Sequence, residues 1–323
     1  MSDTRLTVIV PGYNNKIEWW QRCLVSIINV TTASDEIIVV DDGSKLDNAN
    51  ALAAYVAKLK SDAQIKVLRK TNGGLASARN AALAEAKGKF VTFVDSDDEL
   101  CNDILNKCVS KLEQSDCDIC IYGVRVIWTE DGLCKEDVPE NAALGCLDEE
   151  KVFDLYRKCL LNYSCNKVYR HSIVGETRFD MDGMPCEDII FNFECIAKKA
   201  TFCSVPEVGY LYYRRDGTLL SRYVSTYDYG VDRQYELWIR LFGKAPFTKQ
   251  YISKCKWMNL WRPGSPMSAF ERWRWLRNHS EVGGLLAYIK TFASMVLRHY
   301  VYIRPVRRWR IKHMFPAVNN LQK

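Results

Sequence analysis

Carboxylate and hydroxyl side chains gather at the ends of two short apolar runs in the first hundred residues. Ile37–Val40 leads into DDGS (Asp41–Ser44), and Phe90–Val94 leads into DSDD (Asp95–Asp98). Uninterrupted apolar runs of this length suit strands that are buried on both faces of a parallel sheet. Ligands of open α/β sheets bind beyond the carboxyl ends of such strands. The two clusters are therefore predicted to share a ligand site.

The second cluster has the spacing of a divalent-cation site. Asp95 and Asp97 flank Ser96, and two carboxylates with one spacer can share a cation while leaving positions for a diphosphate. Such a cation would stabilise the charge that develops on a departing nucleotide diphosphate. The alternative is a solvated loop in which Ser96 or Asp98 caps the helix that leads to Leu112.

The first cluster and a later glycine pair offer groups that suit a nucleotide. Asp41 and Asp42 are ionised acceptors for the imide N–H of a base or for ribose hydroxyls, although an Asp-Gly turn is also common turn chemistry. Asn72 and Gly73 precede an alanine-rich segment, where glycine and the N–H groups of a helix start favour phosphate. Arg79, inside that segment, would reach a phosphate or stack on a base. Its alternative is a surface salt bridge.

A further acidic pair, Glu187-Asp188, stands at the start of a predicted helix. A carboxylate at this position is a candidate general base toward an acceptor hydroxyl. Acidic residues at a helix start also stabilise the helix macrodipole, so the pair alone leaves both interpretations open.

Taken in order, these segments resemble the motifs of the inverting family-two glycosyltransferases with the GT-A fold, over roughly residues 5–220. The matching segments are VIVPGYNN (Val8–Asn15), VVDDGS (Val39–Ser44), NGGLASARN (Asn72–Asn80), FVDSDD (Phe93–Asp98), CNKVYR (Cys165–Arg170) and CEDIIF (Cys186–Phe191). Six motifs in the right order are far more specific than any one of them.

The resemblance implies a role for each motif. The nucleotide, usually uridine diphosphate, would be held by Pro11, Tyr13, Asp41, Asp42, Asn72, Gly73, Arg79 and Ser96. Asp95 and Asp97 would hold Mn²⁺ or Mg²⁺, and Asp188 would be the catalytic base. The donor and acceptor side would be lined by Asn166, Lys167, Glu187 and Arg214, the last belonging to a Tyr-Arg…Ser element that continues to Ser221.

The implied reaction moves one sugar from a nucleotide sugar to a hydroxyl of a glycan or lipid-linked acceptor, with inversion, in bacterial surface polysaccharide synthesis. Processive family members carry a QxxRW motif, but here Ala269 stands where the glutamine would precede Arg272-Trp273. Single transfer is therefore expected. The alternatives are a nucleotidyltransferase, for which a basic glycine-rich loop after the first strand is missing, and a non-catalytic nucleotide-binding protein at the membrane.

Alternating strand-like and helix-like segments predict an α/β fold, a GT-A-like doubly wound, mostly parallel sheet. Strands are predicted at Leu6–Val10, Ile37–Val40, Ile65–Leu68, Phe90–Val94, Ile119–Ile127, Val168-Tyr169 and Val208–Arg214. Helices are predicted from Trp19 to Ile28, at Asp47–Lys60, at Leu75–Lys87, before Leu112, at Leu147–Leu161 and at Ile189–Lys198.

Charge divides the chain into two predicted domains. The catalytic, nucleotide-sugar-binding domain is expected at residues 1–224, and a helical, basic, Trp-rich extension at residues 225–323. The extension has 18 Lys and Arg against 5 Asp and Glu, a net charge of +13, whereas residues 1–224 have 27 against 34, a net charge of −7. A basic extension of this kind indicates an anionic partner.

The extension also holds six of the nine tryptophans: Trp238, Trp257, Trp261, Trp273, Trp275 and Trp309. Tryptophan among Lys and Arg suits a helix in the headgroup region of an anionic membrane. The basic residues are densest between Arg304 and Lys312. The alternative is a helical subdomain whose tryptophans pack on the core. Nucleic-acid binding is disfavoured because no recognised module is present.

The remaining bulk features suit a globular protein in a reducing compartment. The chain has 323 residues, of which 48% are apolar and 26% charged. Thirteen irregularly spaced cysteines and no apolar segment at the start predict a cytoplasmic protein. The basic, Trp-rich extension predicts that it is peripheral at the inner face of the cell membrane. The CxxC pair Cys117 and Cys120 alternates like a strand, which disfavours a zinc or redox role.

Overall fold

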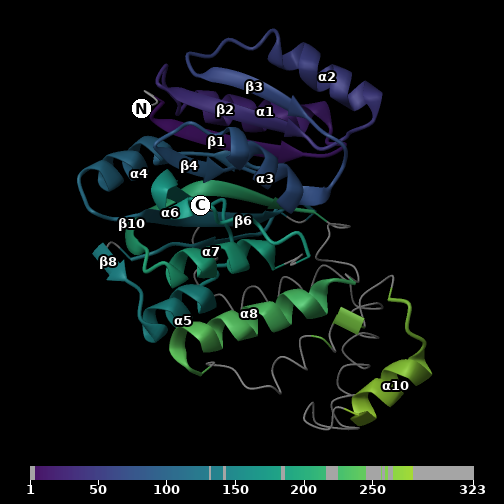
Figure 1. Ribbon diagram of the computed structural model, residues 1–323. Coiled ribbons are helices and arrows are strands. Elements are labelled where there is room, and N and C mark those ends of the chain that lie inside the picture. Colours follow the sequence, from purple (N-terminus) through teal and green to yellow (C-terminus); the bar gives the residue numbers. More distant parts are fainter. Residues whose placement is uncertain are drawn as a thin grey trace. The chain divides into compact units, whose positions relative to one another are not determined.

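The computed structural model describes residues 4–130, 132–140, 143–182, 186–215, 225–244, 256, 259–260 and 265–278. Two compact units divide the chain (Figure 1). The first comprises the residues up to Val126 together with Glu136–Met181 and Glu187–Tyr213. The second comprises Ile127–Lys135, Asp182–Cys186 and the chain from Arg214 onward. No single boundary along the sequence separates the two units.

A mixed sheet forms the centre of the first unit, and in the described residues it has ten strands. They are β1 (Leu6–Gly12), β2 (Asp35–Asp41), β3 (Gln64–Arg69), β4 (Phe90–Phe93), β5 (Glu99–Leu100), β6 (Ile119–Trp128), β7 (Cys134–Asp137), β8 (Ala143–Cys146), β9 (Lys167–Arg170) and β10 (Thr201–Arg214). Their order is β3-β2-β1-β4-β9-β6-β10-β5, with β7 beside β6 and β8 beside β10.

The helices alternate with these strands along the first half of the chain. Those of the first unit are α1 (Ile17–Ile28), α2 (Leu46–Val56), α3 (Gly74–Glu85), α4 (Ile104–Glu113), α5 (Glu149–Arg157), α6 (His171–Val174) and α7 (Glu187–Ala197). Two helices of the second unit are α8 (Tyr227–Phe242) and α10 (Ala269–Asn278).

The parallel part of the sheet confirms the predicted fold class. Strands β1 and β2 run parallel, as do β1 and β4, and β2 and β3. The apolar runs of β1, β2 and β4 are almost entirely buried, as expected of strands covered on both faces. Beyond β4 the pairing turns antiparallel, with β9 between β4 and β6.

Sequence patterns indicated each of the longer strands, although only the second half of β10, and missed the shortest ones. Strand β5 has only two residues, and β7 and β8 have four each. The residues of β7 are all half-buried, so β7 lacks the apolar run that revealed the equally short β4. Strand β10 already begins at Thr201, earlier than the predicted Val208.

Cys117 and Cys120 are both buried free thiols.

The predicted alternative role of Ser96 or Asp98 as a helix cap is wrong. Helix α4 begins at Ile104, and Asp103 precedes it. Asp98 is 1% exposed, and its carboxylate accepts hydrogen bonds from the Tyr210 hydroxyl (2.9 Å) and the Tyr213 amide (2.8 Å). Asp98 therefore joins the loop after β4 to strand β10.

The described part of the second unit includes only some of the basic extension. Trp238 on α8 is fully buried, with its ring 5.8 Å from that of Phe242. No helix among the described residues is long and apolar enough to cross a membrane. Trp257, Trp261, Trp309, Ser221 and the basic run from Arg304 to Lys312 lie outside the described residues, as does the side chain of Trp273.

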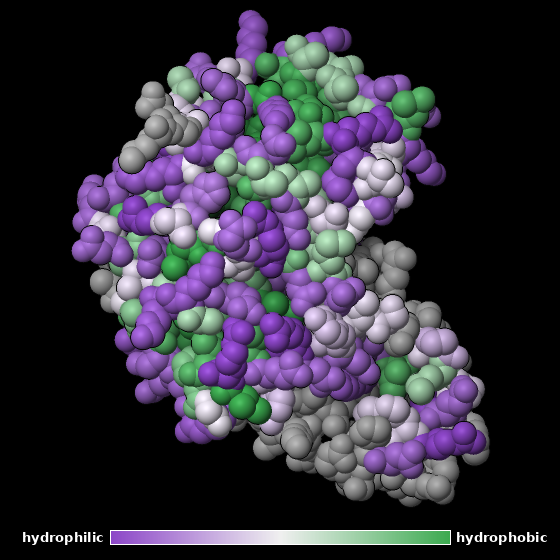
Figure 2. Space-filling model, in the orientation of Figure 1, coloured by the Kyte–Doolittle hydropathy of each residue, from purple (hydrophilic) through white to green (hydrophobic). Residues whose placement is uncertain are grey.

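The surface view shows mostly hydrophilic residues over the first unit, with smaller apolar areas between them (Figure 2). Leu46, at the start of α2, is 64% exposed, and Val67 on β3 is 39% exposed. Scattered exposed apolar residues of this kind are normal for a soluble surface.

Candidate active site

Strand β1 lies between the two strands that deliver the acidic clusters. Gly12 at its end is opposite Asp41 of β2, and Ile9 is opposite Phe93 of β4. The amide of Asp42 donates to the Gly12 carbonyl at 3.0 Å. Because the three strands are parallel neighbours, DDGS and DSDD emerge on either side of the end of β1, as the apolar runs predicted.

Gly12 allows the loop after β4 to approach β1 closely. A Cβ atom at this position would lie 2.5 Å from the Ser96 hydroxyl oxygen and 2.4 Å from the Trp20 ring. Ser96 is 2% exposed and accepts a hydrogen bond from the Asn15 side-chain amide. The contact fixes the middle residue of the acidic triplet against the chain after β1.

Asp42 binds the glycine-containing loop before α3. Its carboxylate accepts hydrogen bonds from the amides of Gly73 (3.1 Å) and Gly74 (2.7 Å) and pairs with Lys70 Nζ at 2.8 Å. The Asn72 side-chain amide donates to the Asp42 carbonyl at 2.9 Å. The amides at the start of α3 were predicted to favour phosphate, but in the structure they donate to the Asp42 carboxylate. The helix macrodipole also stabilises a negative charge at this position.

Asp41 presents a carboxylate oxygen whose hydrogen bonding is incomplete. Its Oδ1 accepts from the Ser44 amide at 3.0 Å, whereas Oδ2 is buried and accepts no hydrogen bond from the described residues. The Arg69 Nε atom lies 3.5 Å from Oδ2. This ion pair is longer than a normal hydrogen bond, so Oδ2 can still accept a hydrogen bond from an additional donor. Tyr13, 51% exposed, follows buried Pro11 at this edge.

Arg79 of α3 is fully buried among three carboxylates. Its Nη2 donates to Asp95 Oδ1 at 2.8 Å, and its Nη1 donates to Asp188 Oδ1 at 2.7 Å. Glu187 Oε1 lies 3.7 Å from Nη1, and the Phe179 ring centre lies 5.0 Å from the guanidinium carbon. The alternative of a surface salt bridge is wrong, because the Arg79 side chain is 0% exposed.

The electrostatics of this cluster follow from one cation among three acids. Burial by itself lowers the pKa of Arg79, but the carboxylates raise it above the ordinary value, so the guanidinium stays charged. Burial raises the pKa of Asp188, and Arg79 opposes that shift. Burial and Asp188 raise the pKa of Glu187, which is 5% exposed. Three carboxylates around one guanidinium carry more negative charge than Arg79 neutralises, so the cluster can take up a proton or an additional cation.

Asp188 lies in the first turn of α7 and keeps a 20% exposed side chain. The hydroxyl of Ser164 donates to Asp188 Oδ1 at 2.7 Å. Ser164 was not predicted as a site residue, although it lies directly before the matched segment that begins at Cys165. A buried serine carries no signal of its own, and only the fold brings it to the carboxylate.

The acidic loop after β4 is fastened to β10 through a tyrosine hydroxyl. Tyr210 accepts a hydrogen bond from the Asp95 amide at 3.0 Å and donates one to Asp98 Oδ2 at 2.9 Å. Burial, with the charges of Asp97 and Asp95, raises the pKa of Asp98 well above its ordinary value. Tyr210 and Asp98 were not predicted as site residues.

Two carboxylates of this loop remain accessible to a cation. The Asp95 side chain is 28% exposed, and Asp97 is half-buried. Within the described ranges, no group of three or more His, Cys, Asp or Glu side chains is arranged to hold a metal. A cation held by Asp95 and Asp97 would therefore take further ligands from phosphate oxygens and water, as Mg²⁺ commonly does.

Asn166 and Lys167, expected on the donor or acceptor side, are fully buried. Lys167 Nζ donates to the Leu160 carbonyl (2.7 Å), to Asn166 Oδ1 (2.7 Å) and to the Tyr163 carbonyl. Burial lowers the pKa of Lys167 to about 7. Both side chains bind the chain segment that carries Ser164. Arg214 is exposed and belongs to the second unit.

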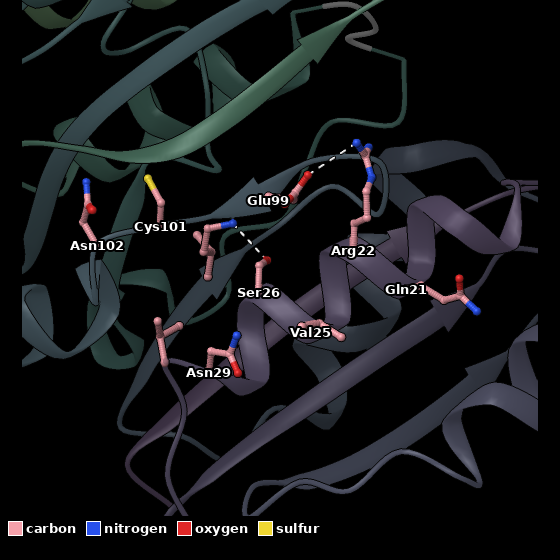
Figure 3. Close-up of a pocket in the computed structure, with 10 residues that line it drawn as sticks. Gln21, Arg22, Val25, Ser26, Asn29, Glu99, Cys101 and Asn102 are labelled. Carbon is pink, nitrogen blue, oxygen red and sulfur yellow. Dashed lines mark hydrogen bonds and ion pairs between the residues drawn. The ribbon is translucent and has the colours of Figure 1, made fainter.

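A cavity of about 570 Å³ lies between α1 and the residues around β5 (Figure 3). It is lined by Gln21, Arg22, Val25, Ser26, Asn29, Val30, Glu99, Leu100, Cys101 and Asn102. Arg22 and Glu99 form an ion pair at 3.5 Å, and the Leu100 amide donates to the Ser26 hydroxyl. None of the predicted site residues lines this cavity.

The amino-acid sequence is similar to one protein family and to several glycosyltransferases of that kind. The model of Glycosyl transferase family 2 matches residues 7–178. Glycosyltransferase GlyA of Streptococcus pneumoniae is 30% identical over 67% of this chain, which spans 32% of the length of GlyA. The uncharacterized glycosyltransferase EpsJ of Bacillus subtilis is 27% identical over 74% of this chain and 70% of its own.

Solved structures of S. aureus TarS share the fold. The complex of TarS 1–349 with UDP-GlcNAc superposes with a TM-score of 0.62 and 20% identity, covering 84% of this chain and 79% of that one. The complex with UDP gives a TM-score of 0.60 at 19% identity, covering 86% and 79%. At this identity the likeness supports the GT-A-like arrangement of the first unit.

Proposed function

The chain belongs to glycosyl transferase family 2, and from this premise we propose that it transfers a single sugar from a nucleotide sugar to an acceptor hydroxyl with inversion. The donor nucleotide is uridine diphosphate, and the acceptor is a glycan or a lipid-linked sugar in surface polysaccharide synthesis. The observation that carries the proposal is the position of Arg79 between Asp95 and Asp188.

Arg79 brings a candidate diphosphate site next to a candidate base. Asp95 belongs to the acidic triplet after β4, and Asp188 lies in the first turn of α7, yet both bind the same guanidinium. In-line displacement needs the leaving group and the base on opposite sides of the anomeric carbon, within the width of one sugar. Two carboxylates joined by one buried arginine suit that distance. They are also held rigidly, as positioning of reacting groups requires.

Asp188 performs the proton transfer in this proposal. Burial raises the pKa of its carboxyl, which makes the carboxylate a better base than an exposed aspartate. Its 20% side-chain exposure leaves access for an acceptor. The acceptor oxygen attacks the anomeric carbon as its proton passes to Asp188, and the nucleotide diphosphate leaves from the opposite face.

The nucleotide occupies the edge formed by β1, β2 and the loop before α3. The buried Asp41 Oδ2 supports an acceptor role toward a base or ribose donor. Tyr13 offers an exposed ring for stacking, while Asn72 and Gly73 lie exposed beside Asp42. The uridine nucleotides bound to TarS in its solved complexes support the choice of uridine diphosphate.

Asp95 and Asp97 are the residues that would hold Mn²⁺ or Mg²⁺. Their accessible carboxylates and the surplus of acids around Arg79 support a divalent cation at this position. When bound, the cation supplies Lewis-acid stabilisation of the departing diphosphate. Arg79 orients Asp95 through the hydrogen bond from Nη2 to Oδ1.

The basic extension supports a location at the membrane surface, where the enzyme would bind its acceptor. We place the protein in the cytoplasm, peripheral at the inner face of the membrane, because residues 225–323 carry a net charge of +13. A lipid-linked acceptor would then lie at the same surface as the enzyme.

The test is a panel of nucleotide sugars with Mn²⁺, in which binding is followed by calorimetry and nucleotide release by a coupled assay. Binding of a UDP-linked sugar with slow release of UDP is expected. A protein that binds none of the UDP sugars, but binds another nucleotide sugar, would contradict the uridine assignment. Binding of no nucleotide sugar at all would contradict the proposed function.

A further inference from the structure

Both hydrogen bonds that reach the Asp188 carboxylate within the described residues end on the same oxygen. Arg79 Nη1 and the Ser164 hydroxyl each donate to Oδ1 at 2.7 Å. Oδ2 takes part in neither contact. Arg79 and Ser164 are both 0% exposed, whereas the Asp188 side chain is 20% exposed.

We propose that Ser164 is a positioning residue for Asp188. Ser164 and Arg79 both donate hydrogen bonds to Oδ1 of Asp188, which leaves Oδ2 as the atom that accepts the proton. The inference rests on the proposed function and specifies how its base is oriented. The acceptor O–H bond breaks, and its proton forms an O–H bond with Oδ2. The acceptor oxygen bonds to the anomeric carbon, and the bond to the diphosphate breaks with its electron pair leaving on the diphosphate.

Protonation at Oδ2 is compatible with both existing contacts. In the resulting carboxylic acid Oδ1 becomes the carbonyl oxygen, which still accepts from the arginine and from the serine. Protonation at Oδ1 would instead place a proton where two donors already point. The arrangement therefore allows the base to change its charge without losing a hydrogen bond, which limits reorganisation during the reaction.

Ser164 is held in place from two sides. Lys167 Nζ donates to the Leu160 carbonyl at 2.7 Å and to the Tyr163 carbonyl. Asn192 Nδ2 donates to the Leu161 carbonyl at 2.9 Å and to the same Tyr163 carbonyl at 3.0 Å. These contacts fix the main chain immediately before Ser164.

Helix α7 provides one of these supports and the base itself. Asp188 and Asn192 are four residues apart on α7, so they lie on the same face of the helix. Asp188 accepts a hydrogen bond from the Ser164 hydroxyl. Asn192 donates one to the carbonyl of Tyr163, the residue before Ser164. One helical face thus contacts the serine segment at two points, which sets the position of the hydroxyl relative to the carboxylate.

The test measures hydrolysis of UDP-linked hexoses and N-acetylhexosamines with Mn²⁺, with water as the acceptor. Ser164→Ala should lower kcat by roughly 10- to 100-fold, the range for a hydrogen bond to a charged group, while the donor KM stays within about twofold. On the Asp188→Asn background, Ser164→Ala should have no further effect, because the serine acts through the carboxylate.

Ser204→Ala is the matched control. Ser204 is also fully buried, and its hydroxyl donates to the Glu140 carbonyl. This variant should lose stability without losing kcat. A wild-type kcat for Ser164→Ala, or an equal loss on the Asp188→Asn background, would overturn the role of Ser164 and leave the proposed function standing. A wild-type protein that binds no UDP sugar would overturn both.

A urea-unfolding cycle over Ser164→Ala, Asp188→Ala and the double variant tests the contact without turnover, because alanine removes the oxygen that accepts from Ser164. The destabilisations should be clearly non-additive, since the two side chains bond directly. Additive effects would contradict the contact on which the inference rests.

Discussion

Arg79 Nη1 lies 2.7 Å from Asp188 Oδ1, although the two residues are 109 positions apart in the sequence. Arg79 belongs to the alanine-rich helix α3, and Asp188 lies in the first turn of α7. The other end of the same guanidinium binds Asp95. A side chain that resembles a phosphate ligand in the sequence is, in the fold, the link between the acidic triplet and the candidate base.

Arg79→Met should be among the most damaging substitutions in the protein. It leaves buried carboxylates without their cation, and removing one partner of a buried ion pair costs about 3–5 kcal/mol. The free energy of urea-induced unfolding measures this loss. Lys66→Met is the control, because the Lys66–Glu85 pair is about half exposed and should contribute less than 1 kcal/mol. A similar loss for both variants would contradict the buried cluster.

Asp188→Asn should reduce sugar transfer to a small residual rate while leaving nucleotide binding nearly intact. The amide keeps the shape of the side chain but cannot take up a proton, and loss of a general base commonly lowers rates by about 10²–10⁴-fold. Calorimetry with UDP and a transfer assay on the same preparation separate the two effects. Unchanged activity would remove Asp188 from the role of base.

Tyr210→Phe should weaken metal-dependent nucleotide binding. It removes the hydroxyl that joins the Asp95 amide to Asp98, so the acidic loop loses its attachment to β10. Calorimetry with UDP, with and without Mn²⁺, should show the loss mainly with Mn²⁺, as it should for Asp97→Ala. Tyr122→Phe is the control, because that buried hydroxyl donates to the Cys165 carbonyl. Equal effects of the two tyrosine variants would contradict a specific role for Tyr210.

Lys167 should make stability rise with pH above neutrality. Burial lowers its pKa to about 7, below the value of about 10.4 in an unfolded chain. Between these values the unfolded chain holds more protons, so the free energy of unfolding increases with pH; below about pH 7 this contribution no longer changes. The free energy of unfolding of the wild type, minus that of Lys167→Met, should therefore increase from pH 7 to pH 9.

Lys198→Met serves as the control for that experiment. Lys198 is exposed, and its Nζ also donates to two main-chain carbonyls, those of Ile173 and Val174. This variant measures the effect of removing an exposed ammonium that makes the same kind of main-chain contacts. A difference for Lys167→Met that does not change with pH would contradict the lowered pKa of Lys167.

Deletion of residues 301–323 should release the protein from anionic liposomes. Each basic residue near such a surface contributes about 1 kcal/mol, and the segment is rich in arginine. Sedimentation with phosphatidylserine-containing vesicles, compared with neutral vesicles, measures the effect. Unchanged sedimentation of the shortened protein would contradict membrane association through this segment.

The sequence by itself determined the parallel core and the place of the acidic clusters. Apolar runs such as Ile37–Val40 and Phe90–Val94 are local signals, because a strand buried on both faces must be apolar along its length. The residues that follow them, Asp41 and Asp95, are then bound to emerge at one edge of the sheet. Order and spacing of the motifs also sufficed to indicate the family.

Only the tertiary structure decided which side chains meet. The pairing of Arg79 with Asp188, the hydroxyl of Ser164 on the same oxygen, and the burial of Lys167 all join segments that are distant in sequence or lie on different elements. An isolated arginine, serine or lysine looks the same whether it is solvated or buried. Its surroundings are set by helix and strand packing, which no local pattern of residues records.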